Sequence, residues 1–512
     1  MIMYLAKQKD IEMLYQSNKQ MYYKIELLDR SYRILDYLEG NLISDSLSIN
    51  ADSDIRRTYN CEILVTDSSF NINSNSKIWF DKIIRPYIGI KYERTGEILW
   101  YLLGTFLFND YNYNFDVTTR TLSLTCNDMM CLLNDTRSGQ LDSYQRKIKV
   151  DSDARSIIIA ILKEIGITEY MIEFNINNTT TNTFKIPYDK TFSSGSNAYQ
   201  IIKEIIDLYP GTEMYFDING LFTIGRKPTG DNEIYIPSEV FNDIIISEKL
   251  NSSLNNIYNR IEVWGKVNEP SYYCNGVYNN STDHIYSLSL VSKKYEYDSD
   301  GTTPKIIDYT SYSNGDTFAF KVPATNSTIQ KININNIGAY PIQDENGAYI
   351  TSGILQAGTD YVFRYRKSVN GNDNFLLLGS YQNYGCAYLT NNYNDHSEYA
   401  VIDVNSEMCV EKLGTLRKVL SDNEADNITS DNLCCQRARM ELYNTIRMNE
   451  TLSLKMILIP WLDVNQLIEY TSLSTGETNK YLINSISYNN VECTMDVQLT
   501  RYYPNYINKN QL

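Results

Sequence analysis

The two histidines, His284 and His396, are the only imidazoles in the chain, and imidazole is the commonest general base in enzymes. Neither has a second metal ligand three or four residues away, so the HExxH pattern of zinc hydrolases is absent. No GxSxG segment is present to place a nucleophilic serine on a sharp turn, although a triad assembled from distant segments would leave no local pattern. We predict no catalytic role for either histidine.

Carboxylates are too numerous to indicate a site by themselves, since 62 Asp and Glu residues could supply a glycosidase-like pair in many places. Asp298-Ser-Asp300-Gly301 resembles the start of a calcium loop but lacks the later glutamate that such a loop requires. There is no CxxC pair for a thiolate zinc site and no glycine-rich phosphate loop. The sequence therefore predicts no catalytic residues, no metal and no cofactor.

Two groups of residues are candidates for binding. The pair Arg56-Arg57 could meet a carboxylate of a neighbouring subunit, could pair with Asp52 or Asp54 in its own chain, or could lie on a solvated face. Trp461 is a further candidate for a subunit contact. A run of tyrosines could instead stack on sugar rings or form a subunit contact. It comprises Tyr381, Tyr384, Tyr388, Tyr393 and Tyr399.

The bulk composition describes an acidic, folded protein. Lys and Arg total 46 against 62 Asp and Glu, a formal net charge of −16, and no basic run is present. An acidic chain without a basic run is a poor candidate for gripping nucleic acid through its phosphates, but its surface would let DNA pass without sticking. Nine scattered cysteines predict reduced, buried thiols. We expect neither a signal peptide nor a membrane-spanning segment.

Period-two alternation and 44 tyrosines indicate a mainly β protein with a small α+β module. Strands are predicted from Tyr23 onward, including a single strand over 99–108. Five regions are predicted: an N-terminal arm (1–21), a first β-barrel (22–135), an α+β connecting module (136–230), a second β-barrel (231–267 with 401–512) and an inserted β-sandwich (268–400).

The connecting module carries the sharpest local signals. One helix is expected to begin after Ser152 or Asp153 and to end at Gly166, and a second to begin after Ser196 or Asn197 and to end by Pro210-Gly211. Asn219-Gly220 predicts a hairpin with a two-residue type I′ turn. A further helix is expected over 430–447, before the last strands.

The last eighty residues carry a resemblance. The segments 450–470, 480–488 and 495–504, with Ile459-Pro460 and Leu462-Asp-Val-Asn465 between strands, resemble the closing β-barrel of phage tail hub and tail-tip proteins. In that family this phrase recurs as four strands. Residues 44–58, including Arg56-Arg57, resemble a turn in the same family's first tube-like barrel. Residues 311–379 resemble a small β-sandwich of tail-fibre proteins.

The resemblance implies a non-enzymatic virion protein with two tube-like β-barrels. Three copies would form a homotrimeric baseplate hub or tail tip, joining a six-fold tail tube or distal tail protein to a three-fold spike or tip protein. The ring would leave an ejection channel for genomic DNA and the tape-measure protein. The resemblance also implies assembly in the host cytoplasm. Closed rings are physically reasonable, because they bury strand edges that would otherwise aggregate.

Two other classes remain open. The chain could be a tail-associated carbohydrate-binding protein that attaches to the host through the inserted sandwich, with Tyr381, Tyr384 and Tyr388 as glycan contacts. It could also be a cell-wall hydrolase with an unrecognised carboxylate pair. Glycan retention by residues 268–400 would favour the binder, and clearing of a cell-wall suspension would favour the hydrolase.

Overall fold

The computed structural model is mainly β with few helices, which confirms the predicted fold class. It describes residues 6–509 apart from 40–41, 67–71, 73–77, 117, 143–144, 175–183, 187–189, 210, 229–233, 242, 266–269, 280–283, 292–308, 345–346, 368–371, 382–395, 403, 405, 422–430, 447–449, 491 and 503–507.

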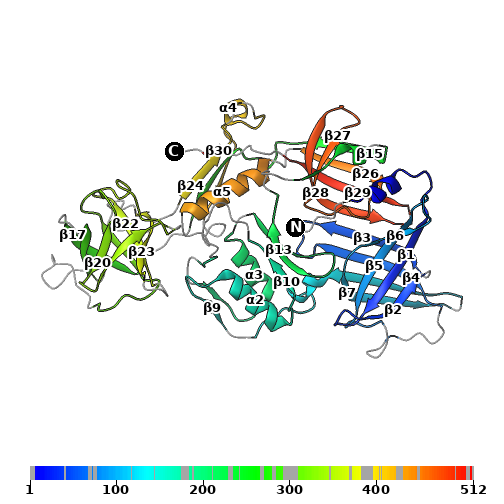
Figure 1. Cartoon of the computed structure of the whole chain (residues 1–512), viewed down its shortest axis with the longest axis horizontal. Coiled ribbons are helices and arrows are strands. Elements are labelled where there is room, and N and C mark those ends of the chain that lie inside the picture. The colour runs from blue at the N-terminus through cyan, green and yellow to red at the C-terminus, as the bar shows by residue number, and fades with distance from the viewer. Residues whose placement is uncertain are drawn as a thin grey trace.

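A 14-stranded sheet dominates the molecule and contains strands from both ends of the chain (Figure 1). Its order is β15 (Ile245–Ser252), β26 (Glu450–Ile457), β29 (Thr494–Arg501), β28 (Thr478–Asn489), β3 (Leu42–Asn50), β4 (Arg57–Leu64), β8 (Arg120–Asp128), β7 (Phe106–Phe115), β5 (Ile83–Lys91), β1 (Met21–Leu28) and β2 (Ile34–Glu39). Three strands lie off this path: β6 (Ile98–Leu102) pairs with β5, β27 (Leu467–Thr471) with β28, and β14 (Tyr235–Ile236) with β27.

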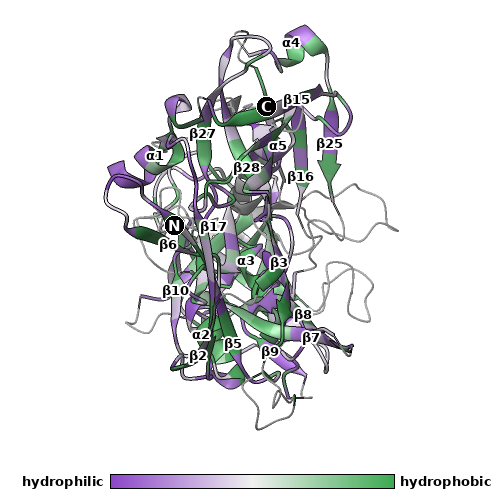
Figure 2. Ribbon diagram, turned by 90° about the vertical axis from the view of Figure 1, so that its right-hand side faces the viewer, coloured by the Kyte–Doolittle hydropathy of each residue, from purple (hydrophilic) through white to green (hydrophobic). Residues whose placement is uncertain are grey.

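The pairing of β3 with β28 joins the regions that the sequence predicts as two barrels. These strands run antiparallel, with Ile49 opposite Ile486 and Leu47 opposite Tyr488. In Figure 1 the blue N-terminal strands accordingly lie beside the red C-terminal ones. Buried and more exposed residues alternate along strands such as β4 and β26. Figure 2 shows hydrophilic and hydrophobic residues along the strands. One hydrophobic core, with buried residues from both regions, lies beneath the combined sheet.

The resemblance implied four C-terminal strands, and β26, β27, β28 and β29 confirm this number. The single strand predicted over 99–108 is wrong, because β6 ends at Leu102 and β7 begins at Phe106. Gly104 lies in the break, and a Cβ there would approach the Phe106 ring to 2.6 Å. The break lets Thr105 donate a hydrogen bond from Oγ1 to the Ile218 carbonyl, at 3.0 Å, in the connecting module.

The N-terminal arm contains helix α1 (Gln8–Leu14). Its apolar face enters the core, since Met13 is fully buried and Leu14 is 2 % exposed. The Tyr101 hydroxyl donates to Asp10 Oδ1 at 2.7 Å, and the Tyr92 hydroxyl donates to Glu12. These contacts attach the arm to β6 and to the end of β5.

Two amphipathic helices form in the connecting module at the predicted positions. Asp153 caps α2 (Ala154–Ile165) by accepting from the Ser156 amide, and Gly166 ends it with a φ of 90°. Asn197 caps α3 (Ala198–Ile206) in a capping box with Gln200. Beside the helices lie β10 (Tyr170–Ile172), β13 (Phe222–Arg226) and β12 (Thr212–Phe216) in one sheet, and β9 (Arg146–Ile148) with β11 (Lys190–Phe192) in another.

The predicted hairpin exists as β12 and β13, but its type I′ turn is wrong. Phe216 pairs with Phe222, so the connection contains five residues instead of two. The Gly220 amide donates to the Asp217 carbonyl at 3.0 Å, and of the two predicted turn residues only Gly220 has a positive φ, 84°. The Asp217 carboxylate also accepts from the amides of Asn219 and Leu221, which makes the longer loop stable.

The inserted region is a closed barrel where the sequence predicts a β-sandwich. Seven strands close in the order β17 (Tyr272–Asn279), β18 (Ile285–Val291), β20 (Lys331–Ile334), β21 (Ala339–Gln343), β23 (Asn374–Tyr381), β22 (Asp360–Arg366) and β19 (Thr317–Lys321). The parallel pairing of β17 with β19 completes the closure. Its aromatic-rich core is separate from that of the large sheet, and Figure 1 shows the barrel projecting from the rest of the chain.

A further sheet lies between the inserted barrel and the large sheet. It consists of β25 (Arg417–Leu420), β16 (Arg260–Trp264), β24 (His396–Ala400) and β30 (Asn508–Lys509), packed against α5 (Asp431–Ile446). Residues 231–267 and 401–512 therefore divide between this sheet and the large one. The remaining short helices are α4 (Val410–Leu413), η1 (Met129–Leu132) and η2 (Ser238–Phe241).

Candidate functional site

Arg56, Arg57 and Trp461, the three predicted contact residues, all line one cavity of about 340 Å³. Three of the parts of the chain that line it supply most of its polar groups: the start of β4, the β12–β13 hairpin of the connecting module, and the loop between β26 and β27. Arg56 is 5 % exposed and Arg57 is 2 % exposed, so neither arginine lies on a solvated face. We call this meeting of three elements the arginine junction.

Arg56 binds the connecting module. Its Nη2 lies 2.6 Å from Glu213 Oε2, and its guanidinium carbon lies 4.0 Å from the centroid of the Tyr215 ring. Asn465 of the β26–β27 loop donates from Nδ2 to the same Glu213 oxygen at 2.6 Å. One buried carboxylate therefore joins these three parts of the chain.

Arg57 makes a second set of links. Its Nη1 donates to the Phe216 carbonyl at 3.0 Å, and its Nη2 forms an ion pair with Asp463. Its backbone amide donates to Asp128 Oδ2 at 2.9 Å. Both arginines therefore form ion pairs within the chain, Arg56 with Glu213 and Arg57 with Asp463. The predicted partners Asp52 and Asp54 were the wrong carboxylates.

The electrostatics of the junction follow from burial and pairing. Burial alone would lower the pKa of Arg56, but the charges of Glu213 and Asp463 outweigh it, so the pKa is raised. Burial raises the pKa of Asp128, although hydrogen bonds from the amides of Arg57 and Met130 oppose this. Burial, together with the Glu213 charge, raises the pKa of Tyr215 to about 12. Arg56 therefore stays charged at neutral pH.

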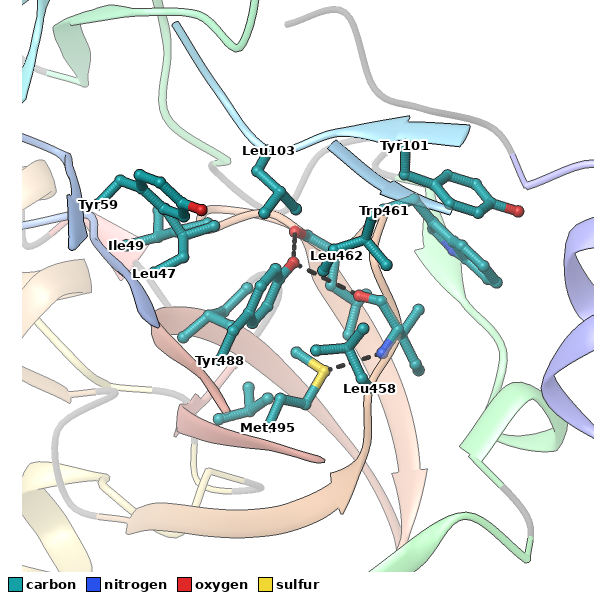
Figure 3. Packing of buried hydrophobic residues seen from close by; sticks show 14 of the residues in the cluster. Leu47, Ile49, Tyr59, Tyr101, Leu103, Leu458, Trp461, Leu462, Tyr488 and Met495 are labelled. Atoms are coloured by element: carbon teal, nitrogen blue, oxygen red, sulfur yellow. Dashed lines mark hydrogen bonds between the residues drawn. The ribbon is translucent and has the colours of Figure 1, made fainter. Parts of the chain in front are cut away.

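Apolar packing holds the Trp461 side of the cavity (Figure 3). Trp461 is 7 % exposed, and its ring centroid lies 5.8 Å from that of Tyr101. The Tyr488 hydroxyl donates to the carbonyls of Leu462, at 3.3 Å, and Ile459, at 3.5 Å. The β26–β27 loop is thereby held against β28 and β6, with Asp463 and Asn465 placed toward the arginines.

The junction has the composition of a structural connection. Its charged groups are paired with one another, and among the described residues no group of three or more His, Cys, Asp or Glu could hold a metal ion. Breaking a buried ion pair would leave an uncompensated charge, so the junction resists separation of β4, the β12–β13 hairpin and the β26–β27 loop.

Only some of the other predicted residues lie in the part of the chain that the structure describes. Tyr384, Tyr388 and Tyr393 lie outside the described residues, as do Asp298 and Asp300, while Tyr381 is the last residue of β23. Tyr399 is only 8 % exposed, and its hydroxyl lies 3.1 Å from Cys435 Sγ, so its ring is not available to stack on a sugar. His284 lies between β17 and β18 with a φ of 48°, and His396 begins β24.

Sequence reasoning missed Glu213, Asp463 and Asn465 as junction residues. Asp463 and Asn465 belong to the quoted C-terminal motif, where polar residues between apolar strands were an available signal. Glu213 lies on the hairpin beside apolar residues, and nothing local links it to Arg56, which is 157 positions away in the sequence.

The part of the chain that the structure describes contains no helix long and apolar enough to cross a membrane. A family described as "Domain of unknown function (DUF5048)" matches residues 405–506, about a fifth of the chain. No curated protein matches the sequence.

Solved structures with a similar backbone include three tail proteins. The 43 kDa tail protein of prophage MuSo2 from Shewanella oneidensis has a TM-score of 0.48 and 9 % identity, covering 96 % of this chain and 100 % of that one. A tail protein from Neisseria meningitidis has a TM-score of 0.45 and 8 % identity, covering 94 % and 97 %. Prophage tail protein gp18 from Listeria monocytogenes has a TM-score of 0.42 and 10 % identity, covering 93 % and 94 %.

Proposed function

We propose that the chain is a non-enzymatic structural protein of a phage tail, acting as a baseplate hub or tail tip. The C-terminal motif supports this proposal most directly, because the resemblance implied four strands and the same residues form β26, β27, β28 and β29.

The ends of the large sheet suit assembly into a ring. Within the described residues β2 and β15 terminate the strand order, and each carries exposed apolar side chains, such as Leu35 at 46 % and Ile246 at 55 %. Exposed edge strands of this kind invite pairing with another chain. A homotrimeric ring, as the resemblance implies, would cover such edges and leave a central channel.

The net charge of −16 suits a channel that DNA crosses without binding. The proposed partners are a tail tube or distal tail protein on one side, a spike or tip protein on the other, and the tape-measure protein within. In this role the arginine junction would keep three parts of each subunit in one rigid arrangement during assembly.

Mass photometry of the purified chain, alone and with candidate tail proteins, tests the proposal. A species of three times the chain mass of 59.2 kDa, formed alone or with a tube or spike partner, is the expected result. A monomer that associates with no tail component at any concentration would contradict it.

The inserted barrel favours a second candidate role, attachment to a host-surface carbohydrate. It is closed, has its own core and projects from the remaining chain, as a separate recognition domain would. Retention of the full chain on host cell-wall material, together with loss of retention when the strands of the inserted barrel (272–381) are deleted, would support this role. Equal retention of both proteins would exclude the insert as the attachment domain.

A further inference from the structure

One face of the large sheet packs on the hydrophobic core, and the opposite face carries short polar side chains. Along β29, β28, β3, β4, β8 and β7, alternate residues point away from the core and are exposed or partly exposed. They are Thr494, Asp496 and Gln498 of β29, Ser485, Ser487 and Asn489 of β28, Ser44, Ser46, Ser48 and Asn50 of β3, Thr58, Asn60 and Glu62 of β4, Thr121, Ser123 and Thr125 of β8, and Asp110, Asn112 and Asn114 of β7. We call this surface the polar face.

The strand register joins these residues into rows that cross the sheet. Asn489 lies opposite Ser46, Ser46 lies opposite Asn60, and Asn60 lies opposite Thr125. Because β3 pairs with β28, such a row passes from the C-terminal strands to the N-terminal strands without a break. The polar face is therefore one surface that extends over both predicted barrel regions.

The polar face contains no lysine or arginine. Its charged members are the carboxylates Glu62, Asp110 and Asp496, and all the others are Ser, Thr, Asn or Gln. On the next strand, β26, Lys455 lies opposite Asp496, whose charge balances it, and Lys249 follows on β15. A surface that has only to be soluble usually mixes charges of both signs. Solubility alone therefore does not account for this composition.

The composition of the polar face determines how it would meet duplex DNA. Proteins retain DNA mainly through Lys and Arg, because these side chains replace the counterions of the phosphates. Hydroxyl and amide groups can contact phosphate oxygens but release no counterions, and carboxylates repel the phosphates. The polar face thus offers DNA a wall of short side chains without an ionic contact.

We propose that the polar face lines the channel of the ring and that its lack of cations lets duplex DNA pass without being retained. This inference rests on the proposed ring and adds to it the surface that faces the DNA. The other face of the same strands is filled by the hydrophobic core, so only the polar face of these strands can meet DNA. The local composition of this face, more than the net charge of the whole chain, then accounts for free passage.

Lysines placed on the polar face test the proposal. Ser48 and Ser487 lie opposite each other, so Ser48→Lys combined with Ser487→Lys adds a facing pair of cations to each copy. Rings are assembled first and verified by mass photometry, and fluorescence anisotropy then measures binding of duplex DNA. The wild-type ring is expected to retain none. Two lysines from each of three copies would surround the DNA in the variant ring, so the logarithm of its affinity should fall by about 5 for each tenfold rise in salt concentration.

The topology of the DNA shows where the added lysines lie. A linear duplex can thread an assembled ring, whereas a covalently closed circle of the same sequence cannot. The variant ring is expected to bind the linear duplex and not the circle. Binding of both forms would place the lysines outside the channel, and binding of neither form would also overturn the proposal, while the ring itself would stand. Absence of any ring would instead contradict the proposed function, and this inference with it.

Thr471→Lys combined with Thr478→Lys is the matched control. These threonines face each other in the β27–β28 hairpin, with their hydroxyl oxygens 2.8 Å apart, and lie outside the polar face. The control ring is expected to show no preference for linear DNA, and an equal preference in both rings would overturn the proposal. Ser485→Lys combined with Gln498→Lys is a second facing pair on the polar face. It should give the same result and replaces the first variant if that variant does not assemble.

Discussion

Glu213 is the residue on which the arginine junction depends most, because it receives both the Arg56 guanidinium and the Asn465 amide. Glu213→Gln removes the negative charge and leaves Arg56 buried without its neutralising partner. Removing one member of a buried ion pair costs about 3 kcal/mol of unfolding free energy. We therefore expect the urea midpoint for unfolding of the full chain to decrease clearly. Tryptophan fluorescence monitors the unfolding.

Glu97→Gln is the control for this substitution. Glu97 pairs with Lys9 at 2.9 Å, but both side chains are about half exposed. Exposed pairs contribute about 0 to 1 kcal/mol, so the midpoint is expected to change little. Equal losses in the two variants would show that the junction does not stabilise the fold through its buried charges.

At the scale of the element, Glu248 of β15 holds the loop of the β27–β28 hairpin. Its carboxylate accepts hydrogen bonds from the Tyr470 hydroxyl at 2.7 Å and from the amides of Ser474, at 2.7 Å, and Leu473, at 3.1 Å. Burial alone would raise the pKa of Glu248, but these hydrogen bonds outweigh it and lower the pKa to about 2.

A lowered pKa means that the contribution of Glu248 is complete above its ordinary value of 4.5 and is lost as pH falls toward 2. The Leu473 and Ser474 amides should therefore exchange slowly at neutral pH and lose protection in that acidic interval. Glu248→Gln should remove the protection at all pH values. Glu469→Gln, in the same hairpin and facing Lys480 at 3.8 Å, should retain it. Hydrogen-exchange mass spectrometry distinguishes these outcomes.

At the scale of the whole molecule, the large sheet and the inserted barrel have separate cores. Leu499→Ala removes a buried side chain from β29 and should cost about 2 to 5 kcal/mol. Because N-terminal and C-terminal strands share one core, this change should also lower the denaturant midpoint at which Cys61 of β4 becomes reactive. Cys274, in the barrel core, is the internal control and should keep its midpoint.

Burial raises the pKa of both thiols, so neither should react while its core is folded. Pulsed thiol labelling with mass-spectrometric readout assigns a midpoint to each cysteine. An unchanged Cys61 midpoint in Leu499→Ala would mean that the two ends of the sheet unfold independently.

Local structure was predictable from sequence where a short pattern determines it. Asp153 and Asn197 cap their helices as expected, since a cap depends on residues only three positions away. The prediction of a two-residue hairpin turn was wrong, because the Asp217 side chain favours a longer loop than Asn219-Gly220 alone would indicate. The predicted carboxylate partners of the arginines were wrong, because Asp463 lies 406 positions from Arg57 in the sequence. No local sequence pattern indicates such a pairing.

The antiparallel pairing of β3 with β28 has a consequence for synthesis on the ribosome. Strand β3 is complete at Asn50, but its neighbour begins only at Thr478. At translation rates of about 5 to 20 residues per second, roughly 20 to 90 s separate the two. During that interval β3 is an open strand edge on the nascent chain, and its pairing with β28 is among the last steps that convert a growing polypeptide into a protected sheet.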